Sequence, residues 1–267
     1  MAIRRVHVPK VEPGVIALTE REARHVRDVL RMSADDSVEV FDDAGAVAMG
    51  KLVAVDPQQV SVAVDRVSSH DAHFELIVAA AVPKGDRADW MIEKLSELGV
   101  SRFVPLQTER SVVLPQGRNK IDRWARIATE AAKQSHRAGV MRIDPLTPLE
   151  AAIEQVVTRA SSPARESLAR ARTPVSRGVV LSTAPHATSI IQAFPSSVLD
   201  PPSSLALFIG PEGGWTETEL DRMIEAGLTP ARLTETILRV ETAAVAAAAV
   251  VATVLDSRAS DSSPATP

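Results

Sequence analysis

The chain has 267 residues, of which 45% are hydrophobic and none is a cysteine. This length and composition predict one large or two modest globular domains. The lack of cysteine, and an N-terminus without the apolar run of a signal peptide, predict a protein of the reducing cytoplasm. The longest apolar stretch, residues 243–255, is shorter than the roughly 20 residues that a bilayer requires, so we expect no membrane span.

The formal net charge of -4 is distributed unevenly along the chain. Residues 1–31 and 84–142 carry net charges of +3 and +5, whereas residues 32–83 and 143–267 carry -7 and -5. Because phosphate binding requires a basic surface, the two basic regions are compatible with one polyanionic partner. Ordinary solvated helix faces explain the same pattern equally well. Aromatic residues make up only 3% of the chain, so we expect no extended aromatic platform for stacked bases.

The first 70 or so residues have mainly the pattern of β-strands. Apolar and polar residues alternate in residues 37–41, 46–55 and 59–67, and turn sequences separate these runs. One helix interrupts them, since Thr19 and Glu22 have the spacing of a capping box. Apolar residues follow at helical spacing, namely Ala23, Val26, Val29 and Leu30. A small barrel that carries one helix fits this pattern.

After a polar seam at residues 68–73, strands alternate with helices. This order is typical of an α/β domain with a mainly parallel sheet. We expect strands at residues 74–82, 102–106, 178–182 and 204–209, and helices at residues 86–98, 121–133, 149–158 and 241–255. Residues 160–177 lack apolar periodicity and are predicted to be an exposed, mobile insertion, and residues 257–267 a disordered tail.

The strongest local signal for a ligand site is a glycine-rich turn between a strand and a helix. The apolar run at residues 205–209 leads into Gly210-Pro211-Glu212-Gly213-Gly214, and Thr216 and Glu219 form a second capping-box pattern. Three glycines allow the backbone to approach a ligand closely, and ligands of open α/β sheets bind beyond the carboxyl ends of the strands. A plain connector between a strand and a helix would need only one glycine.

Several other classes of site do not fit the sequence. The chain contains neither the phosphate-binding pattern G-x-x-x-x-G-K-[ST] nor a G-x-G-x-x-G that follows a strand. Six scattered histidines without any cysteine provide no zinc-site spacing, and no G-x-S-x-G marks a nucleophile elbow. ATP hydrolysis, dinucleotide chemistry, zinc chemistry and serine hydrolysis are therefore not expected.

The glycine-rich turn and the segment Leu238-Arg239-Val240-Glu241-Thr242-Ala243 together resemble the RsmE family of small-subunit rRNA uridine-N3 methyltransferases, which belongs to the SPOUT superfamily. Further segments match the same template in order and spacing, namely residues 25–32, 93–100, 109–111 and 133–137. The resemblance covers nearly the whole chain apart from the insertion and the tail. Two positions depart from the family pattern: Lys133 replaces an acidic residue, and residues 233–236 lack a glycine and a cation.

The resemblance implies a PUA-like RNA-binding β-barrel at residues 1–71 and a SPOUT domain with a trefoil knot at residues 72–256. It further implies a homodimer, S-adenosylmethionine as the methyl donor, and 16S rRNA or the small ribosomal subunit as the partner. The donor would be held by Leu181, Ser182, Thr183, Ile209, Gly210, Pro211, Glu212, Gly213, Gly214, Leu233, Ile237 and Leu238.

For the chemistry, the donor carries its own electrophile, so no metal is required. Loss of the uracil N3 proton develops negative charge, which Arg137, the favoured candidate, or Arg239 would stabilise. Glu241 or Glu212 would accept the proton, although Glu241 is also well placed to meet the dipole of its helix.

The residues expected to contact RNA are cations: Arg4, Arg5, Arg24, Arg27, Arg31, Lys84 and Arg110. Two alternatives remain open at this point. One is a non-catalytic RNA-binding or ribosome-assembly factor, against which the intact glycine-rich turn argues. The other is a SPOUT methyltransferase that acts on another RNA.

Overall fold

The structure is a computed structural model, and it describes residues 3–69, 74–115, 117–160, 176–184, 187–193 and 204–261. The chain divides into two compact units, each of which is described by itself. The N-terminal unit comprises Met1–Ala72 and Ala128–Met141, and the C-terminal unit comprises His73–Ile127 and Arg142–Pro267. The boundaries expected from the sequence assign residues 128–141 to the second domain, whereas their contacts group them with the first unit.

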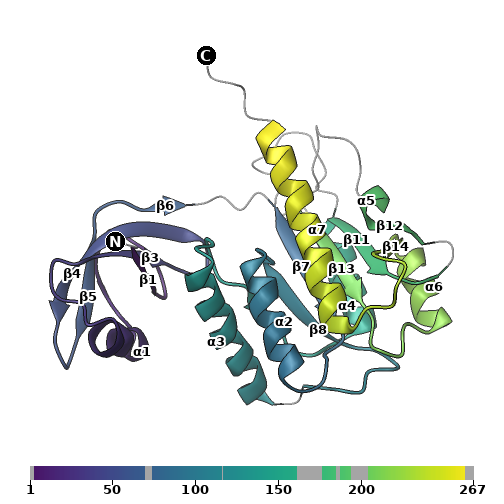
Figure 1. The fold of residues 1–267 in the computed structure, drawn as a ribbon, viewed down its shortest axis with the longest axis horizontal. Helices are drawn as coiled ribbons and strands as arrows, with labels where there is room; N and C mark the ends of the chain where they lie inside the picture. Colours follow the sequence, from purple (N-terminus) through teal and green to yellow (C-terminus); the bar gives the residue numbers. More distant parts are fainter. Residues whose placement is uncertain are drawn as a thin grey trace. The chain divides into compact units, whose positions relative to one another are not determined.

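The N-terminal unit contains one sheet of short strands in the order β1-β3-β4-β5-β2, with β6 paired to β4 (Figure 1). Neighbouring strands are antiparallel except for β1 and β3, which are parallel. The strands are β1 (Arg4–His7), β2 (Gly14–Ala17), β3 (Ser37–Phe41), β4 (Ala46–Val55), β5 (Val60–Val64) and β6 (Ser68–Ser69).

Alternating apolar residues of this sheet form the core of the N-terminal unit. Val38 and Val40 of β3 and Val62 of β5 are fully buried, as the period-two pattern predicts. Gly50 is required where β4 pairs with β5, because a Cβ atom there would lie 2.4 Å from Val62 Cγ1 and 2.8 Å from the Ala63 carbonyl oxygen. Val26 of the helical segment is fully buried and packs into the same apolar cluster as the strand residues.

That helical segment consists of α1 (Glu20–Arg24) followed by a single π-helical turn, η1 (His25–Val29). The Thr19 hydroxyl accepts a hydrogen bond from the Glu22 backbone N–H, which confirms the Thr19 half of the predicted capping box. The Glu22 carboxylate pairs with Lys133 instead of completing the box. The Leu30 N–H donates to the His25 carbonyl oxygen at 2.9 Å, a bond that spans five residues. The extra residue in this turn places Val29 at 67% exposure, so the prediction that it lies in the buried stripe is wrong.

The C-terminal unit contains an eight-stranded parallel sheet in the order β10-β8-β7-β13-β11-β14-β12, with β9 paired to β8. This topology confirms the predicted α/β class with a mainly parallel sheet. The strands are β7 (Glu75–Ala80), β8 (Arg102–Gln107), β9 (Arg142–Ile143), β10 (Thr147–Pro148), β11 (Ser176–Leu181), β12 (Thr188–Ser189), β13 (Ser204–Ile209) and β14 (Thr229–Arg232).

Helices cover both faces of this sheet. Ile77 and Phe208 pack into one apolar cluster with α4 residues, whereas their neighbours Val78 and Leu207 are buried on the opposite face, where α7 contacts β7 and β13. All six residues of β13 are buried, which is typical of a parallel strand covered on both sides. The helices are α2 (Asp86–Glu97), α4 (Leu149–Ala160), α5 (Ile190–Ala193), α6 (Glu217–Glu225) and α7 (Val240–Asp261). A further helix, α3 (Arg118–Gln134), begins in this unit, and its residues from 128 onward belong to the N-terminal unit.

The last helix is longer than the sequence predicts. We expected a helix to Leu255 and a disordered tail from residue 257, whereas α7 continues to Asp261, and residues 262–267 lie outside the described residues. Of the expected insertion at residues 160–177, residue 160 ends α4 and Ser176 begins β11, while residues 161–175 also lie outside them. No helix within the described ranges is long and apolar enough to cross a membrane.

Candidate functional site

The glycine-rich turn lies between the end of β13 and the start of α6. The Gly214 N–H donates to the Pro211 carbonyl oxygen at 2.8 Å, and Gly214 has a φ of +70°, a conformation that favours glycine. The predicted capping box of Thr216 and Glu219 is present in full at the start of α6. The turn is therefore tight, and a capped helix follows it directly.

The turn is packed closely against Trp215. A Cβ atom on Gly210 would lie 3.0 Å from the Trp215 ring, so a larger residue there would displace the indole. The Trp215 Nε1–H donates to the Leu181 carbonyl oxygen at 2.9 Å, which connects the turn to the end of β11. Trp215 thus holds the ends of two neighbouring strands together.

A cavity of about 490 Å³, called the donor cavity below, opens at the carboxyl ends of β11, β13 and β14. It lies at the edge of the sheet where ligands of α/β proteins bind. Its lining includes every residue that the sequence predicts to hold the donor, namely Leu181, Ser182, Thr183, Ile209, Gly210, Pro211, Glu212, Gly213, Gly214, Leu233, Ile237 and Leu238. Three chain segments that are distant in sequence meet there.

Sequence reasoning missed other lining residues, among them Trp215, Leu220 and Arg232. Arg232 ends β14, and the Thr234 hydroxyl donates to the Thr236 carbonyl oxygen at 2.8 Å. These polar groups occupy the loop in which the family's usual glycine and cation are missing. A charged residue at the end of a strand, directly before this loop, was the signal that could have identified Arg232.

Arg110 also lines the donor cavity, although the sequence predicts it to contact RNA. Its Nη1 donates to the Gly213 carbonyl oxygen at 2.8 Å and to that of Trp215 at 3.4 Å. The buried Glu219 adds a second connection, since its Oε1 accepts from the Glu109 N–H at 2.8 Å. The segment that contains Arg110 therefore braces the glycine-rich turn.

The two catalytic candidates near α7 do not line the donor cavity. Val240 and Ala243 do line it, whereas Glu241, between them, is 6% exposed and accepts a hydrogen bond from Arg87 Nη1 at 3.4 Å. Because successive helical residues turn by about 100°, Glu241 faces α2 and not the cavity. Arg239 precedes α7, is exposed, and is likewise absent from the lining.

The favoured catalytic candidate, Arg137, belongs to the N-terminal unit and is not among the residues that line the donor cavity. Its side chain is half-buried, and this burial lowers the pKa of the guanidinium to about 10. At neutral pH the group is still charged. Its backbone carbonyl oxygen accepts a hydrogen bond from Arg5 Nη1 at 3.0 Å.

Among the cations expected to contact RNA, Arg5 has a structural position instead. It is 7% exposed and forms an ion pair with Glu39. Its Cζ atom lies 4.3 Å from the centre of the Phe41 ring. Arg24 and Arg27 have acidic partners on their own helical segment, Glu20 and Asp28 respectively. The remaining three, Arg4, Arg31 and Lys84, are exposed.

In the part of the chain that the structure describes, no three His, Asp or Glu side chains gather as a metal site would require. The donor cavity instead presents backbone groups of the glycine-rich turn, threonine hydroxyls and the guanidinium groups of Arg110 and Arg232. Such a lining suits a small polar organic ligand held largely by main-chain hydrogen bonds.

Two family models match the chain. Residues 70–252 match an RNA methyltransferase domain, and residues 18–65 match an RNA methyltransferase PUA domain. Ribosomal RNA small subunit methyltransferase E of Bacillus subtilis is 31% identical over 239 residues, covering 87% of each chain. The protein of the same name from Synechocystis is 31% identical over 259 residues, covering 96% of this chain and 79% of its own.

Solved structures are similar over nearly the whole chain. The ribosomal RNA small subunit methyltransferase E of Neisseria gonorrhoeae, bound to S-adenosylmethionine, has a TM-score of 0.73 at 26% identity, covering 95% of this chain and 98% of its own. A putative methyltransferase of Legionella pneumophila, in complex with the same cofactor, has a TM-score of 0.74 at 26% identity and the same coverage.

Proposed function

Since the chain belongs to the RNA methyltransferase family that includes ribosomal RNA small subunit methyltransferase E, we propose that it methylates N3 of a uridine in 16S rRNA with S-adenosylmethionine as donor. The observation that carries this proposal is the donor cavity, in which all the residues predicted to hold the donor meet at three strand ends. The relatives bound to the same cofactor support it.

The residues of the donor cavity fit S-adenosylmethionine. A Cβ atom would lie 3.0 Å from the Trp215 ring at Gly210 and 3.3 Å from Arg110 at Gly213, so both positions suit glycine. The backbone of the turn therefore forms this wall of the donor cavity. When bound, the donor supplies a sulfonium-activated methyl group. The turn, the end of β11 and the loop after β14 would fix its position through main-chain groups.

The remaining task of the protein is to orient the uracil and manage one proton. As N3–H is lost, negative charge develops on the ring, and a preorganised cation stabilises it. We propose Arg137 and Arg239 for this role, because a guanidinium group carries a positive charge at neutral pH and can stabilise a developing anion. Glu241 faces α2 beside Arg87, a position that supports the orientation of α7 better than proton transfer.

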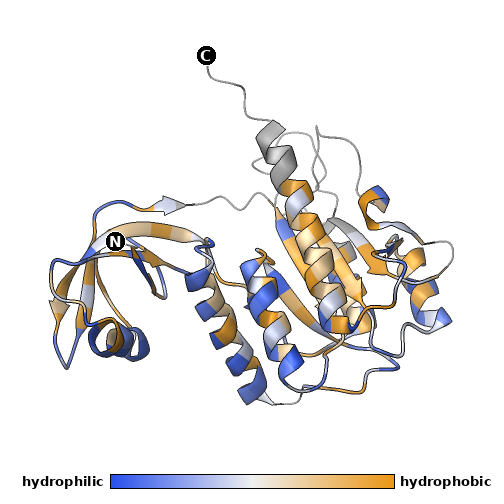
Figure 2. Cartoon of the chain, in the orientation of Figure 1, coloured by the Kyte–Doolittle hydropathy of each residue, from blue (hydrophilic) through white to orange (hydrophobic). Residues whose placement is uncertain are grey.

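We also propose that the protein is a cytoplasmic homodimer whose interface includes α7. Figure 2 shows hydrophobic residues along this helix, and residues 242–255 contain no charged side chain. Half-buried alanines and valines such as Ala246 and Val250 remain on its outer side. Light scattering after size-exclusion chromatography tests this, and a monomeric mass at micromolar concentration would contradict it.

Nucleoside mapping by mass spectrometry tests the reaction. We expect 16S rRNA from cells with the gene to contain one N3-methyluridine that is absent from cells without it. The purified protein with S-adenosylmethionine should restore the modification on the unmodified RNA or subunit. Donor binding without any methylation would favour a non-catalytic assembly factor, and methylation of another RNA would favour a different substrate.

A further inference from the structure

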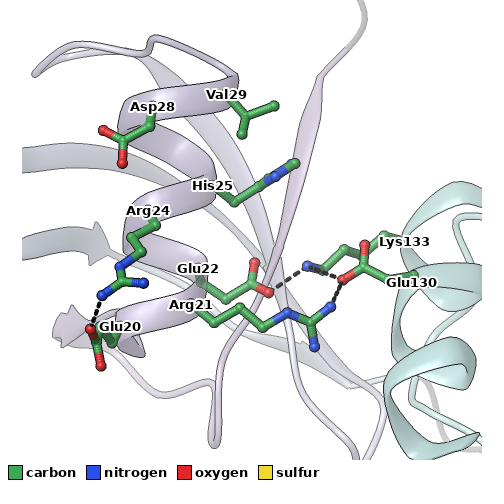
Figure 3. Close-up of a pocket in the computed structure, with 9 residues that line it drawn as sticks. All are labelled: Glu20, Arg21, Glu22, Arg24, His25, Asp28, Val29, Glu130 and Lys133. Atoms are coloured by element: carbon green, nitrogen blue, oxygen red, sulfur yellow. Dashed lines mark hydrogen bonds and ion pairs between the residues drawn. The ribbon is translucent and has the colours of Figure 1, made fainter. Parts of the chain in front are cut away.

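A second cavity, of about 570 Å³, lies within the N-terminal unit between the α1 and η1 segment and the last turns of α3 (Figure 3). We call it the α1 cavity. It shares no lining residue with the donor cavity. Its size is within the range of roughly 300 to 1,000 Å³ of small-ligand sites.

The floor of the α1 cavity is a buried ion pair with one unused oxygen. The side chains of Glu22 and Lys133 are 5% and 7% exposed, and Lys133 Nζ contacts Glu22 Oε1. Glu22 Oε2 is buried and has no hydrogen-bond partner among the residues that the structure describes. In Figure 3 the second carboxylate oxygen is turned away from Lys133. A buried acceptor without a partner is costly, so a ligand that donates to it is favoured.

The charges around this floor are balanced. Each carboxylate that lines the cavity has a cationic partner, in the pairs Glu20–Arg24, Glu22–Lys133, Glu130–Arg21 and Asp28–Arg27. Arg27 itself lies outside the lining, but because each carboxylate is paired, a cationic or anionic ligand gains only a weak attraction from these charges. The ligand that fits best is a neutral group with an N–H donor.

The wall of the cavity suits a flat ring. His25 and Val29 project to the same side of the helical segment in Figure 3, one turn beyond Glu22. The π-helical turn brings this about, because it moves Val29 out of the core to 67% exposure. Single π-helical turns occur frequently at functional sites, and unpaired bases of RNA stack on aromatic side chains such as that of His25, beside which Val29 offers an apolar contact.

We propose that the α1 cavity receives one unpaired nucleobase of the RNA substrate, which donates an N–H to Glu22 Oε2 and packs against His25 and Val29. This inference rests on the proposed function, since the ligand is RNA. Carboxylates accept hydrogen bonds from amino groups of bases, and proteins recognise RNA sequence mainly at unpaired bases. The family model of the PUA domain covers the α1 side of the cavity.

The main test removes the floor without changing the net charge. The double variant Glu22→Met/Lys133→Met replaces a buried ion pair by side chains of similar size, an exchange that proteins often tolerate. The matched control is Lys10→Gln/Glu12→Gln, which removes an exposed ion pair of the same unit outside the cavity. Binding is measured by fluorescence anisotropy with a short mixed-sequence single-stranded RNA and with its duplex form.

We expect the double variant to bind the single strand about tenfold more weakly, with unchanged affinity for the duplex and for S-adenosylmethionine. The control should behave as the wild type. Wild-type affinity of the folded double variant for the single strand overturns the inference, as does an equal loss for the duplex. If the double variant binds an arginine-rich peptide more weakly than the wild type does but binds RNA equally well, the cavity receives a protein side chain and the inference is wrong.

Val29→Ala provides a second test that does not depend on the buried pair, because Val29 is exposed. We expect roughly threefold to tenfold weaker binding of the single strand, because the variant loses the apolar area of two methyl groups against the base, and unchanged binding contradicts the proposal. Measured methyl transfer to RNA distinguishes a failure of the proposed function from a failure of the α1 cavity proposal. If the wild type transfers no methyl group to any RNA, the proposed function fails. If wild type and double variant transfer it with equal KM for RNA, only the α1 cavity proposal fails.

Discussion

The indole Nε1 of Trp215 donates a hydrogen bond of 2.9 Å to the carbonyl oxygen of Leu181, although 34 residues separate them. The same ring lies directly beneath Gly210. One side chain therefore fixes the distance between the end of β11 and the glycine-rich turn after β13. The shape of the donor cavity depends on this distance, because both segments line it.

Replacing Trp215 by phenylalanine removes this hydrogen bond and keeps a ring beneath the turn. A net hydrogen bond contributes about 0.5 to 1.5 kcal/mol, so we expect the Kd for S-adenosylmethionine to rise roughly twofold to tenfold. Isothermal titration calorimetry measures the change. Trp90→Phe is the control, since Trp90 is an exposed residue of α2. Equal affinities of the two variants would contradict the role of the bond.

The two glycines of the turn should differ in their tolerance of alanine. At Gly210 the added methyl group would lie 3.0 Å from the Trp215 ring, which is fixed by its hydrogen bond. At Gly213 it would lie 3.3 Å from Cβ and Cδ of Arg110, a contact that a shift of a few tenths of an ångström relieves without breaking the hydrogen bonds of the guanidinium group. We expect Gly210→Ala to weaken donor binding at least tenfold, as overpacking costs of about 1 to 3 kcal/mol imply. Gly213→Ala should weaken it only a few fold. Calorimetry that ranks the variants in the opposite order would show that the turn packs differently.

Arg110 should act on the donor and not on the RNA. Its guanidinium group donates to carbonyl oxygens of the turn, so Arg110→Ala should raise the Kd for S-adenosylmethionine about tenfold, as loss of a charged hydrogen bond of 1.5 to 3 kcal/mol implies. Arg110→Lys should restore part of this loss. The dependence of RNA affinity on salt should be unchanged, whereas a phosphate contact would lower its slope by about one. A lower slope would therefore restore the original RNA-binding prediction.

Sequence reasoning located the donor cavity because its main signals are local. Three glycines, a capping box and an apolar strand are contiguous at residues 204–219, and family resemblance adds the segments after β11 and β14. The brace by Arg110 was not predictable in this way, since it joins residues 103 positions apart. The trefoil knot stays a prediction, because the family likeness alone carries it.

In the N-terminal unit, the structure contradicts two predictions made from the sequence, those for Val29 and Arg5. Helical periodicity placed Val29 in the core, but one π-helical turn is invisible to a pattern with a fixed period, and the side chain is exposed. The sequence predicts Arg5 to be a surface cation, but its guanidinium group is buried. It pairs with Glu39 on β3 and donates to two carbonyl oxygens near the end of α3. Such tertiary partners override the usual preference of arginine for the surface.

Arg137 provides the sharpest test of the catalytic hypothesis. Burial lowers the pKa of its guanidinium to about 10, yet the group stays protonated at neutral pH and can stabilise a uracil anion. We expect Arg137→Ala to leave S-adenosylmethionine affinity unchanged and to lower the single-turnover rate of methyl transfer by a factor of about 100 or more. Arg66→Ala, at an exposed position of the same unit, is the control and should keep full activity. Because the lost cation would stabilise only the transition state, kcat should fall and KM for RNA should change little. A rise in KM with unchanged kcat would instead assign Arg137 to RNA binding.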